Sequence, residues 1–170
     1  YPVKAAEVST LSRRSLGIGY IGLAHYLAKN KVKYNDPEAL QLVHDLTERF
    51  QFYLLKASNQ IAEEKGACEW FDRTKYADGI LPIDTYKKSV DELVKPKYNM
   101  DWEGLRKSIK ENGLRHSTLT AQMPSESSSV VSNATNGIEP PRDHLSVKKS
   151  KKGTLKQVVP QYSLLKNAYT

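Results

Sequence analysis

The residues best suited to chemistry form a serine-rich stretch, Pro124-Ser-Glu-Ser-Ser-Ser129, between a short β-type run and a predicted helix. The first N–H groups of a helix have no partner within it, and the helix dipole places positive charge at that end. Serine hydroxyls add donors and leave room for an anion, so a phosphate could bind here without a lysine. A serine that simply caps its own helix has the same signature. The stretch therefore predicts either a phosphate-binding loop or an ordinary helix cap.

A second pattern, Gly17-Ile-Gly-Tyr-Ile-Gly22, matches the GxGxxG fingerprint of dinucleotide-binding proteins. The fingerprint needs a buried strand before it and an acidic residue about 20 positions further on to hold the ribose. Residues 7–14 are polar, and the next acidic residue, Asp36, comes too early. We interpret these glycines as allowing close backbone packing before a helix. A dinucleotide-dependent oxidoreductase is the weaker alternative.

The densest positive charge, Lys148-Lys-Ser-Lys-Lys152, is typical of a nucleic-acid-binding segment. No aromatic residue occurs within residues 145–159, whereas proteins that bind single strands usually add stacking aromatics. Lysines at a hairpin tip also discourage pairing with another strand edge. We favour a solvated hairpin and keep a stand-alone nucleotide- or nucleic-acid-binding protein as an alternative.

The other reactive side chains predict no catalytic centre and no metal site. The four histidines show no paired ligand spacing such as HxxxH, and no nucleophile has a base near it in the sequence. Cys68 is the only cysteine, so no disulfide can form within the chain, and we interpret it as a small buried hydrophobe. A single cysteine agrees with a reducing, cytoplasmic setting.

The elements that must position these residues follow from periodicity and capping. Asp36 and Pro37 mark the start of a long amphipathic helix, whose apolar residues recur at steps of three or four until Gly66. Asp101 and Gly113 bound a second helix. Helical stretches or caps are further predicted over 12–29, at Asp72, at Asp84, over 127–134 and from Tyr162 onwards.

Strand signals are fewer than helix signals. Residues 117–122 predict a short β-type run, and residues 145–147 and 155–159 predict a β-hairpin. Long helices alternating with short strands indicate an α/β protein, but these strands are too few to close a sheet. The long helix is also large for a domain of this size, so we expect the chain to belong to a bigger protein.

Length and composition exclude several classes of protein. The chain has 170 residues, which suggests one domain, and its 39% apolar and 26% charged residues are ordinary for a soluble globular protein. No apolar run reaches the roughly 18 residues that span a membrane, and no secretory signal opens the chain. The net charge of +7 favours anionic partners such as nucleotides, nucleic acid or acidic protein surfaces.

Longer motifs follow one another along nearly the whole chain. They are Arg13-Arg-Ser-Leu-Gly-Ile-Gly19, Tyr53-Leu-Leu-Lys-Ala-Ser58, Gly66-Ala-Cys-Glu-Trp-Phe71, Gly79-Ile-Leu-Pro-Ile-Asp-Thr-Tyr-Lys-Lys88, Leu114-Arg115 with Ser117-Thr-Leu119, Met123-Pro-Ser-Glu-Ser-Ser-Ser129 and Asn133-Ala-Thr-Asn-Gly-Ile-Glu-Pro-Pro-Arg142. In this order they resemble the large, catalytic subunit of aerobic class I ribonucleotide reductase. The last two motifs are the most specific, because they are long and closely spaced.

The resemblance implies a ten-stranded α/β barrel, of which residues 1–170 would form an incomplete, helix-rich part. It implies an oxidoreductase that replaces the 2′-hydroxyl of ribonucleoside diphosphates with hydrogen to supply deoxyribonucleotides for DNA synthesis. In that family the Met-Pro-Ser-Glu loop holds the diphosphate of the substrate. The resemblance therefore assigns substrate binding to Ser125, Glu126, Ser127 and Ser128, with Glu126 acting through its N–H because its carboxylate would repel phosphate.

The resemblance also implies what the chain lacks. The family needs a radical-forming cysteine, two reducing cysteines, an asparagine and a glutamate near the radical, a tyrosine pair and a C-terminal cysteine pair. None of these falls in this stretch, and Cys68 matches none of them. We therefore expect no activity from the chain alone.

The partners that the resemblance implies are the rest of the large subunit, the small subunit, thioredoxin or glutaredoxin, and the ribonucleoside diphosphate. The metal and tyrosyl radical would belong to the small subunit, and the effectors ATP and dATP would bind elsewhere. No cofactor and no membrane contact is expected for this segment.

Overall fold

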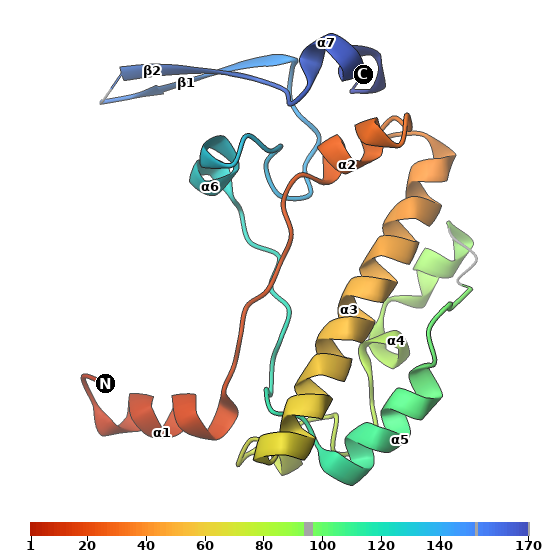
Figure 1. Ribbon diagram of the computed structural model, residues 1–170, viewed down its shortest axis with the longest axis vertical. Coiled ribbons are helices and arrows are strands. Elements are labelled where there is room, and N and C mark those ends of the chain that lie inside the picture. Colours follow the sequence, from red (N-terminus) through yellow and green to blue (C-terminus); the bar gives the residue numbers. More distant parts are fainter. Residues whose placement is uncertain (94–96, 152, 170) are drawn as a thin grey trace. The chain divides into compact units, whose positions relative to one another are not determined.

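The chain forms two compact units in the computed structural model, which describes residues 1–93, 97–151 and 153–169. The helical unit comprises Tyr1–Ile18 and Val43–Ala121, and the loop unit comprises Gly19–Leu42 and Gln122–Thr170. Each unit therefore combines an early and a late segment of the chain, as the colours of Figure 1 show.

Helices make up most of the helical unit. They are α1 (Lys4–Arg13), the larger part of α3 (Pro37–Lys65), the 3-10 turns η1 (Phe71–Arg73) and η2 (Lys88–Glu92), α4 (Pro82–Thr85) and α5 (Trp102–Asn112). The predicted ends of the two main helices are confirmed. α3 begins at Pro37 and is followed by Gly66 with a φ of +81°. Asp101 caps α5 by accepting the Gly104 N–H at 2.9 Å, and Gly113 ends it.

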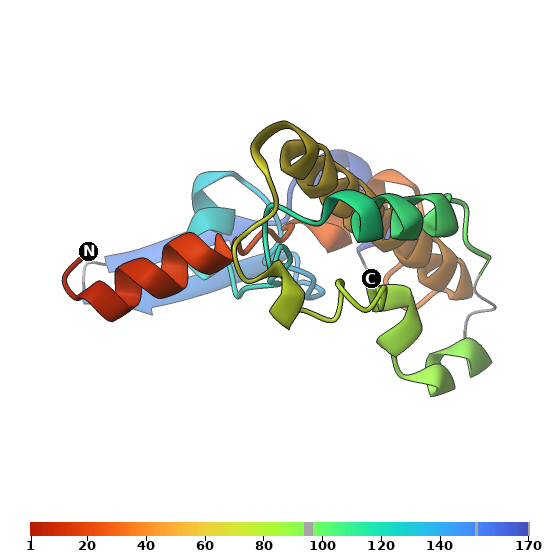
Figure 2. The ribbon, with the colours of Figure 1, turned by 90° about the horizontal axis from the view of Figure 1, so that it is seen from below.

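The core of the helical unit joins α3 to α5, which lie side by side in Figures 1 and 2. The rings of Phe52 and Trp102 meet edge to face with their centroids 5.3 Å apart. The buried cluster around them consists of Phe52, Leu55, Leu81, Trp102, Leu105, Ile109, Leu114 and Leu119. Burial of one such side chain contributes about 1.5–3 kcal/mol, so this cluster is the main source of cohesion between the two helices.

Two extended segments of the helical unit run side by side after α1 and after α5. The Leu16 N–H donates to the Thr118 carbonyl at 2.9 Å, and the Ile18 N–H donates to the Leu119 carbonyl at 2.8 Å. The predicted β-type run 117–122 is thus extended, but it forms only an isolated parallel bridge between Ile18 and Thr120. A Cβ added at Gly17 would lie 3.3 Å from Ala121 Cβ, which agrees with the close packing inferred for these glycines.

The loop unit contains the predicted β-hairpin and several short helices. Its elements are α2 (Leu23–Lys29), α6 (Glu126–Val131), β1 (Leu145–Ser150), β2 (Gly153–Val158), α7 (Tyr162–Leu165) and the 3-10 turn η3 (Lys166–Ala168). β1 and β2 pair antiparallel, from Leu145 opposite Val158 to Ser150 opposite Gly153. Lys152 of the predicted lysine cluster lies outside the described residues.

Several expectations of local structure were wrong. Residues 12–29 do not form one helical approach, because α1 ends at Arg13 and extended chain separates it from α2. α1 itself was not predicted. Asp72 lies inside η1, whose cap position is Trp70. Asp84 is the third residue of α4 and not the residue at the cap position, but its carboxylate does cap the helix by accepting the Leu81 N–H at 2.7 Å.

The fold class is confirmed in its coarser part: the described chain is helix-rich, with one two-stranded sheet. The assignment of residues 1–170 to one incomplete barrel domain stays a prediction. None of the described helices combines the length and the apolar character that a membrane span requires.

Candidate functional site

The four predicted substrate-binding residues lie together where α6 begins. Ser125 occupies the cap position, and Glu126 is the first residue of the helix. Ser125 is buried, with 4% of its surface exposed, whereas Glu126, Ser127 and Ser128 are exposed. Three of the four residues can therefore be reached from solvent, and the fourth is part of the packed interior of the loop unit.

The Ser125 hydroxyl does not cap α6. It donates to Asn136 Oδ1 at 2.9 Å, and it accepts the Gly137 N–H at 2.7 Å. The Ser125 N–H donates to the same Asn136 oxygen at 3.0 Å. No hydrogen bond runs from this side chain to the first turn of α6. Ser125 therefore occupies the cap position without capping α6 through its hydroxyl.

The first turn of α6 keeps hydrogen-bond donors available. Its helical ladder begins at Ser129, whose N–H donates to the Ser125 carbonyl at 2.8 Å. The N–H groups of Ser127 and Ser128, and the Ser127 hydroxyl, have no partner within the described part of the chain. The Ser128 hydroxyl makes only a long contact of 3.3 Å with the Ser125 carbonyl. These donors and the positive end of the helix dipole suit an anion.

A cavity of about 630 Å³ borders the loop on the side of Glu126. Its lining includes Arg142 and Lys149, but also the acidic residues Glu139 and Asp143, so its charge is mixed. Ser127 and Ser128 do not line it. The exposed donors of α6 and this cavity are therefore separate features of the loop unit.

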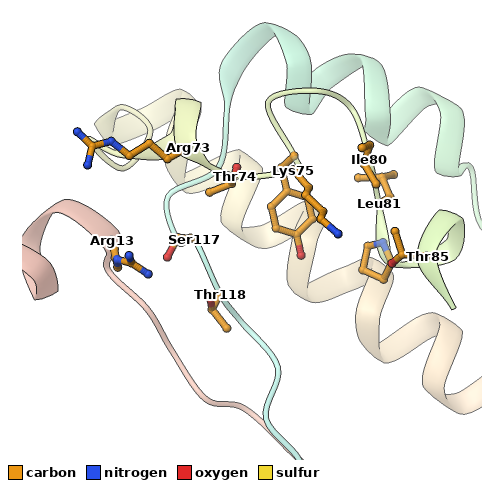
Figure 3. A pocket seen from close by; sticks show the side chains of 11 residues that line it. Arg13, Arg73, Thr74, Lys75, Ile80, Leu81, Thr85, Ser117 and Thr118 are labelled. Atoms are coloured by element: carbon orange, nitrogen blue, oxygen red, sulfur yellow. The ribbon is translucent and has the colours of Figure 1, made fainter.

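The helical unit carries a competing basic site, the pocket of Figure 3. It has a volume of about 390 Å³, and Arg13, Arg73 and Lys75 line it without any acidic residue. The guanidinium carbons of Arg13 and Arg73 lie 5.3 and 4.4 Å from the centre of the Trp70 ring. Figure 3 shows the three cationic side chains spread apart, with Arg73 directed away from Thr118. They do not converge on one point, and the sequence did not single them out.

A group of possible metal ligands was also missed. Ligand atoms of His44, Asp45 and Glu48 lie within 4.8 Å of one another on α3. Glu48 is 6% exposed, and its carboxylate accepts N–H groups of Asn99 at 2.8 Å and of the Trp102 indole at 3.0 Å. These bonds give Glu48 a structural role that needs no ion. The four-residue spacing of His44 and Glu48 on one helix is the signal that could have indicated the group.

Cys68 is the small buried residue that the sequence predicted. It is 3% exposed, and its N–H donates to the Leu114 carbonyl at 2.9 Å. Burial raises the pKa of its thiol, so the reactive thiolate is disfavoured.

Comparison with known sequences decides the family. The family described as "Ribonucleotide reductase, barrel domain" matches residues 1–169. The chain belongs to this family. The resemblance inferred from the motifs is thereby confirmed.

Three similar proteins are ribonucleoside-diphosphate reductase alpha subunits. The chain is 62% identical to the ribonucleoside-diphosphate reductase subunit alpha of Haemophilus influenzae over 169 residues, which cover 99% of the chain and 22% of that relative. It is 57% identical to the ribonucleoside-diphosphate reductase 1 subunit alpha of Escherichia coli (strain K12), again over 99% of the chain and 22% of that relative. The subunit alpha of Enterobacteria phage T4 is 51% identical over 94% of the chain and 21% of its own length.

The chain thus spans 22% of the length of the first of these relatives, within the ribonucleotide reductase barrel domain. Family membership does not by itself assign a role to Ser125, Glu126, Ser127 and Ser128. Their role stays a prediction.

Proposed function

We propose that this chain supplies the substrate-diphosphate loop of a ribonucleoside-diphosphate reductase alpha subunit, with Ser125, Glu126, Ser127 and Ser128 forming the loop that holds the diphosphate. The observation that carries the proposal is the first turn of α6, where the N–H groups of Ser127 and Ser128 and the Ser127 hydroxyl have no partner in the described chain. The names of the relatives support a ribonucleoside diphosphate as the ligand.

The loop would act by binding and orienting the substrate. Backbone N–H groups that point out of a helix start converge on one phosphate, and the helix dipole adds positive potential there. A hydrogen bond to a charged group is worth about 1.5–3 kcal/mol, so two or three of them anchor a diphosphate without a lysine. Glu126 would contribute through its backbone, because its carboxylate repels phosphate.

The rest of the reaction would depend on other polypeptide. The complete enzyme would reduce ribonucleoside diphosphates to deoxyribonucleoside diphosphates in the cytoplasm. It would need the remaining portion of the large subunit, the metal and radical of the small subunit, and thioredoxin or glutaredoxin as reductant. ATP and dATP would bind outside this segment.

The chain alone is expected to reduce no ribonucleotide. The chain has a single cysteine, so no dithiol can form within it. Cys68 is also buried and the pKa of its thiol is raised, so its reactive thiolate is disfavoured. The measurement is turnover of a ribonucleoside diphosphate in the presence of a dithiol and the small subunit. Any deoxynucleotide formed in proportion to the chain would contradict this part of the proposal.

The loop is tested in the full-length subunit. Ser127→Ala or Ser128→Ala removes one hydroxyl and keeps the backbone donors, so KM for the diphosphate should rise about tenfold, which corresponds to about 1.4 kcal/mol. Ser127→Pro also removes an N–H and should raise KM further. Glu126→Gln should have a small effect.

Ser163→Ala is the matched control, because Ser163 is an exposed serine of the same unit. A second control is the affinity for a nucleoside without phosphates, which these changes should leave unaltered. The proposal fails if KM is insensitive to the Ser127 and Ser128 changes. Loss of binding in Lys151→Gln or Arg13→Gln would then favour the basic hairpin or the basic pocket, and with them a different nucleotide-binding function.

A further inference from the structure

We infer that Asn136 is the positioning residue of the diphosphate loop: it holds Ser125 and thereby fixes the direction in which the donors of Ser127 and Ser128 point. The inference rests on the proposed function of the loop. It assigns to Asn136 a role that the motif alone does not reveal, because Asn136 follows Ser125 by eleven residues.

The contacts of Asn136 converge on the residue that begins the loop. Its Oδ1 accepts both the N–H of Ser125, at 3.0 Å, and the hydroxyl of Ser125, at 2.9 Å. The neighbouring Gly137 N–H closes the arrangement by donating to the Ser125 hydroxyl at 2.7 Å. Since Ser125 is buried, water cannot replace these bonds. The backbone entering α6 is therefore fixed two residues before Ser127.

An asparagine is required at this position because it uses both ends of its amide. Its Nδ2 donates to Glu139 Oε2 at 3.0 Å, which orients the carbonyl oxygen towards Ser125. The backbone carbonyl of Asn136 accepts the Glu139 N–H at 3.0 Å, so both the side chain and the backbone of Asn136 are bonded to Glu139. An aspartate would lose the donor and would face the Glu139 carboxylate with like charge.

The turn that carries Asn136 is itself anchored to α2. The Gly22 N–H donates to the Thr135 carbonyl at 3.0 Å, and the Leu23 N–H donates to the Gly137 carbonyl at 3.2 Å. The residues at the start of α2 thus bind carbonyls on both sides of Asn136. Because α2 packs through several buried apolar residues, including Leu23 and Leu27, the turn has a rigid base.

These contacts form a continuous path from α2 through Asn136 to Ser125. Ser125 then acts by its position, since its hydroxyl is directed to Asn136 rather than to a ligand. Removal of the asparagine side chain would let the start of α6 turn away from the phosphate. Misplacement of about 1 Å in a positioning group is enough to weaken a reaction strongly.

The experiment uses the full-length subunit with a ribonucleoside diphosphate as substrate. Asn136→Ala and Ser125→Ala should each raise KM about tenfold and leave kcat within a factor of about three, because they alter binding and not the reacting groups. The effect of the double variant Asn136→Ala/Ser125→Ala should be smaller than the product of the two single effects, because both changes remove the bond between the Ser125 hydroxyl and Asn136 Oδ1. Asn35→Ala, an exposed asparagine of the same unit, should match the wild type.

A merely structural role would give a different pattern. Partial unfolding lowers the active fraction and therefore kcat, but it leaves KM of the folded fraction unchanged. Unchanged KM in Asn136→Ala and Ser125→Ala, or additive effects in the double variant, would overturn the inference. If Asn136→Ala does not fold, Ser125→Ala still removes the bond between the Ser125 hydroxyl and Asn136 and decides the matter.

Failure of the inference can be told from failure of the proposed function. If Ser127→Ala and Ser128→Ala raise KM while the Asn136 and Ser125 changes do not, the loop binds the diphosphate without help from Asn136. If KM responds to none of the four positions, the diphosphate binds elsewhere and both statements are wrong.

Discussion

Glu48→Ala should loosen the segment that leads into α5. The Glu48 carboxylate accepts the N–H groups of Asn99 and Met100 at 2.8 and 3.1 Å and the Trp102 indole N–H at 3.0 Å. Asn99 is exposed and can bond to water instead, whereas Trp102 is buried and Met100 is partly buried. A buried donor left without a partner costs about 1–3 kcal/mol, so the variant should destabilise this segment by about 2–4 kcal/mol.

Amide hydrogen exchange of the purified chain measures this loss directly. A decrease of about 2–4 kcal/mol in the free energy of local opening speeds exchange roughly 30- to 1000-fold, because about 1.4 kcal/mol corresponds to tenfold. The effect should appear in residues 99–112, which include α5. Glu38→Ala on the same helix is the control, since Glu38 is exposed, and it should change exchange by less than about threefold.

The same experiment separates a structural carboxylate from a metal ligand. Addition of a chelator to the wild-type chain should leave exchange in this segment unchanged if Glu48 acts only through hydrogen bonds. The reasoning is refuted if Glu48→Ala alters exchange as little as Glu38→Ala does. It is also refuted if chelation of the wild type reproduces the effect of the variant.

Three further predictions concern titrating groups. Because burial raises the pKa of the Cys68 thiol, a thiol reagent should label the native chain slowly at pH 7.5 and quickly in urea; rapid native labelling would contradict this burial. Burial, and then nearby arginines, lower the pKa of His116, so its contribution to stability is present above about pH 6.5 and is lost as the pH falls. Urea unfolding between pH 7.5 and 5 should show this decline, and His116→Gln should flatten it. Hydrogen bonds from Arg106 lower the pKa of Asp84, so Arg106→Gln should raise that pKa in an NMR titration, and an unchanged pKa would argue against the pair.

Local signals explain what the sequence could predict of the fold. Pro37 and Gly66 mark the ends of α3, and Asp101 and Gly113 mark those of α5, because these residue types act on the backbone of their own neighbourhood. The Asp36 carboxylate accepts the Lys33 N–H at 2.7 Å. α1 was missed because its apolar side chains, such as Val8 and Leu11, stay exposed and form no clear buried stripe. The run 117–122 has the composition of a strand but forms only an isolated bridge, because pairing depends on neighbours that local sequence does not reveal.

In the candidate site, too, the sequence predicted what depends on consecutive residues and not what depends on contacts between distant ones. The serine-rich start of α6 was located from sequence, since the donors belong to consecutive residues. The burial of Ser125 and its bond to Asn136 were not predicted, because they join residues eleven positions apart through a folded turn. The contact of Glu48 with Trp102 joins residues 54 positions apart and was equally out of reach.

The most direct test of the proposed function is an experimental structure of the full-length subunit with a ribonucleoside diphosphate bound. We expect phosphate oxygens within about 2.7–3.2 Å of the backbone nitrogens of Ser127 and Ser128, with the Ser125 hydroxyl still bonded to Asn136. A diphosphate bound in the pocket of Arg13 and Arg73, with no contact to the first turn of α6, would contradict the proposal.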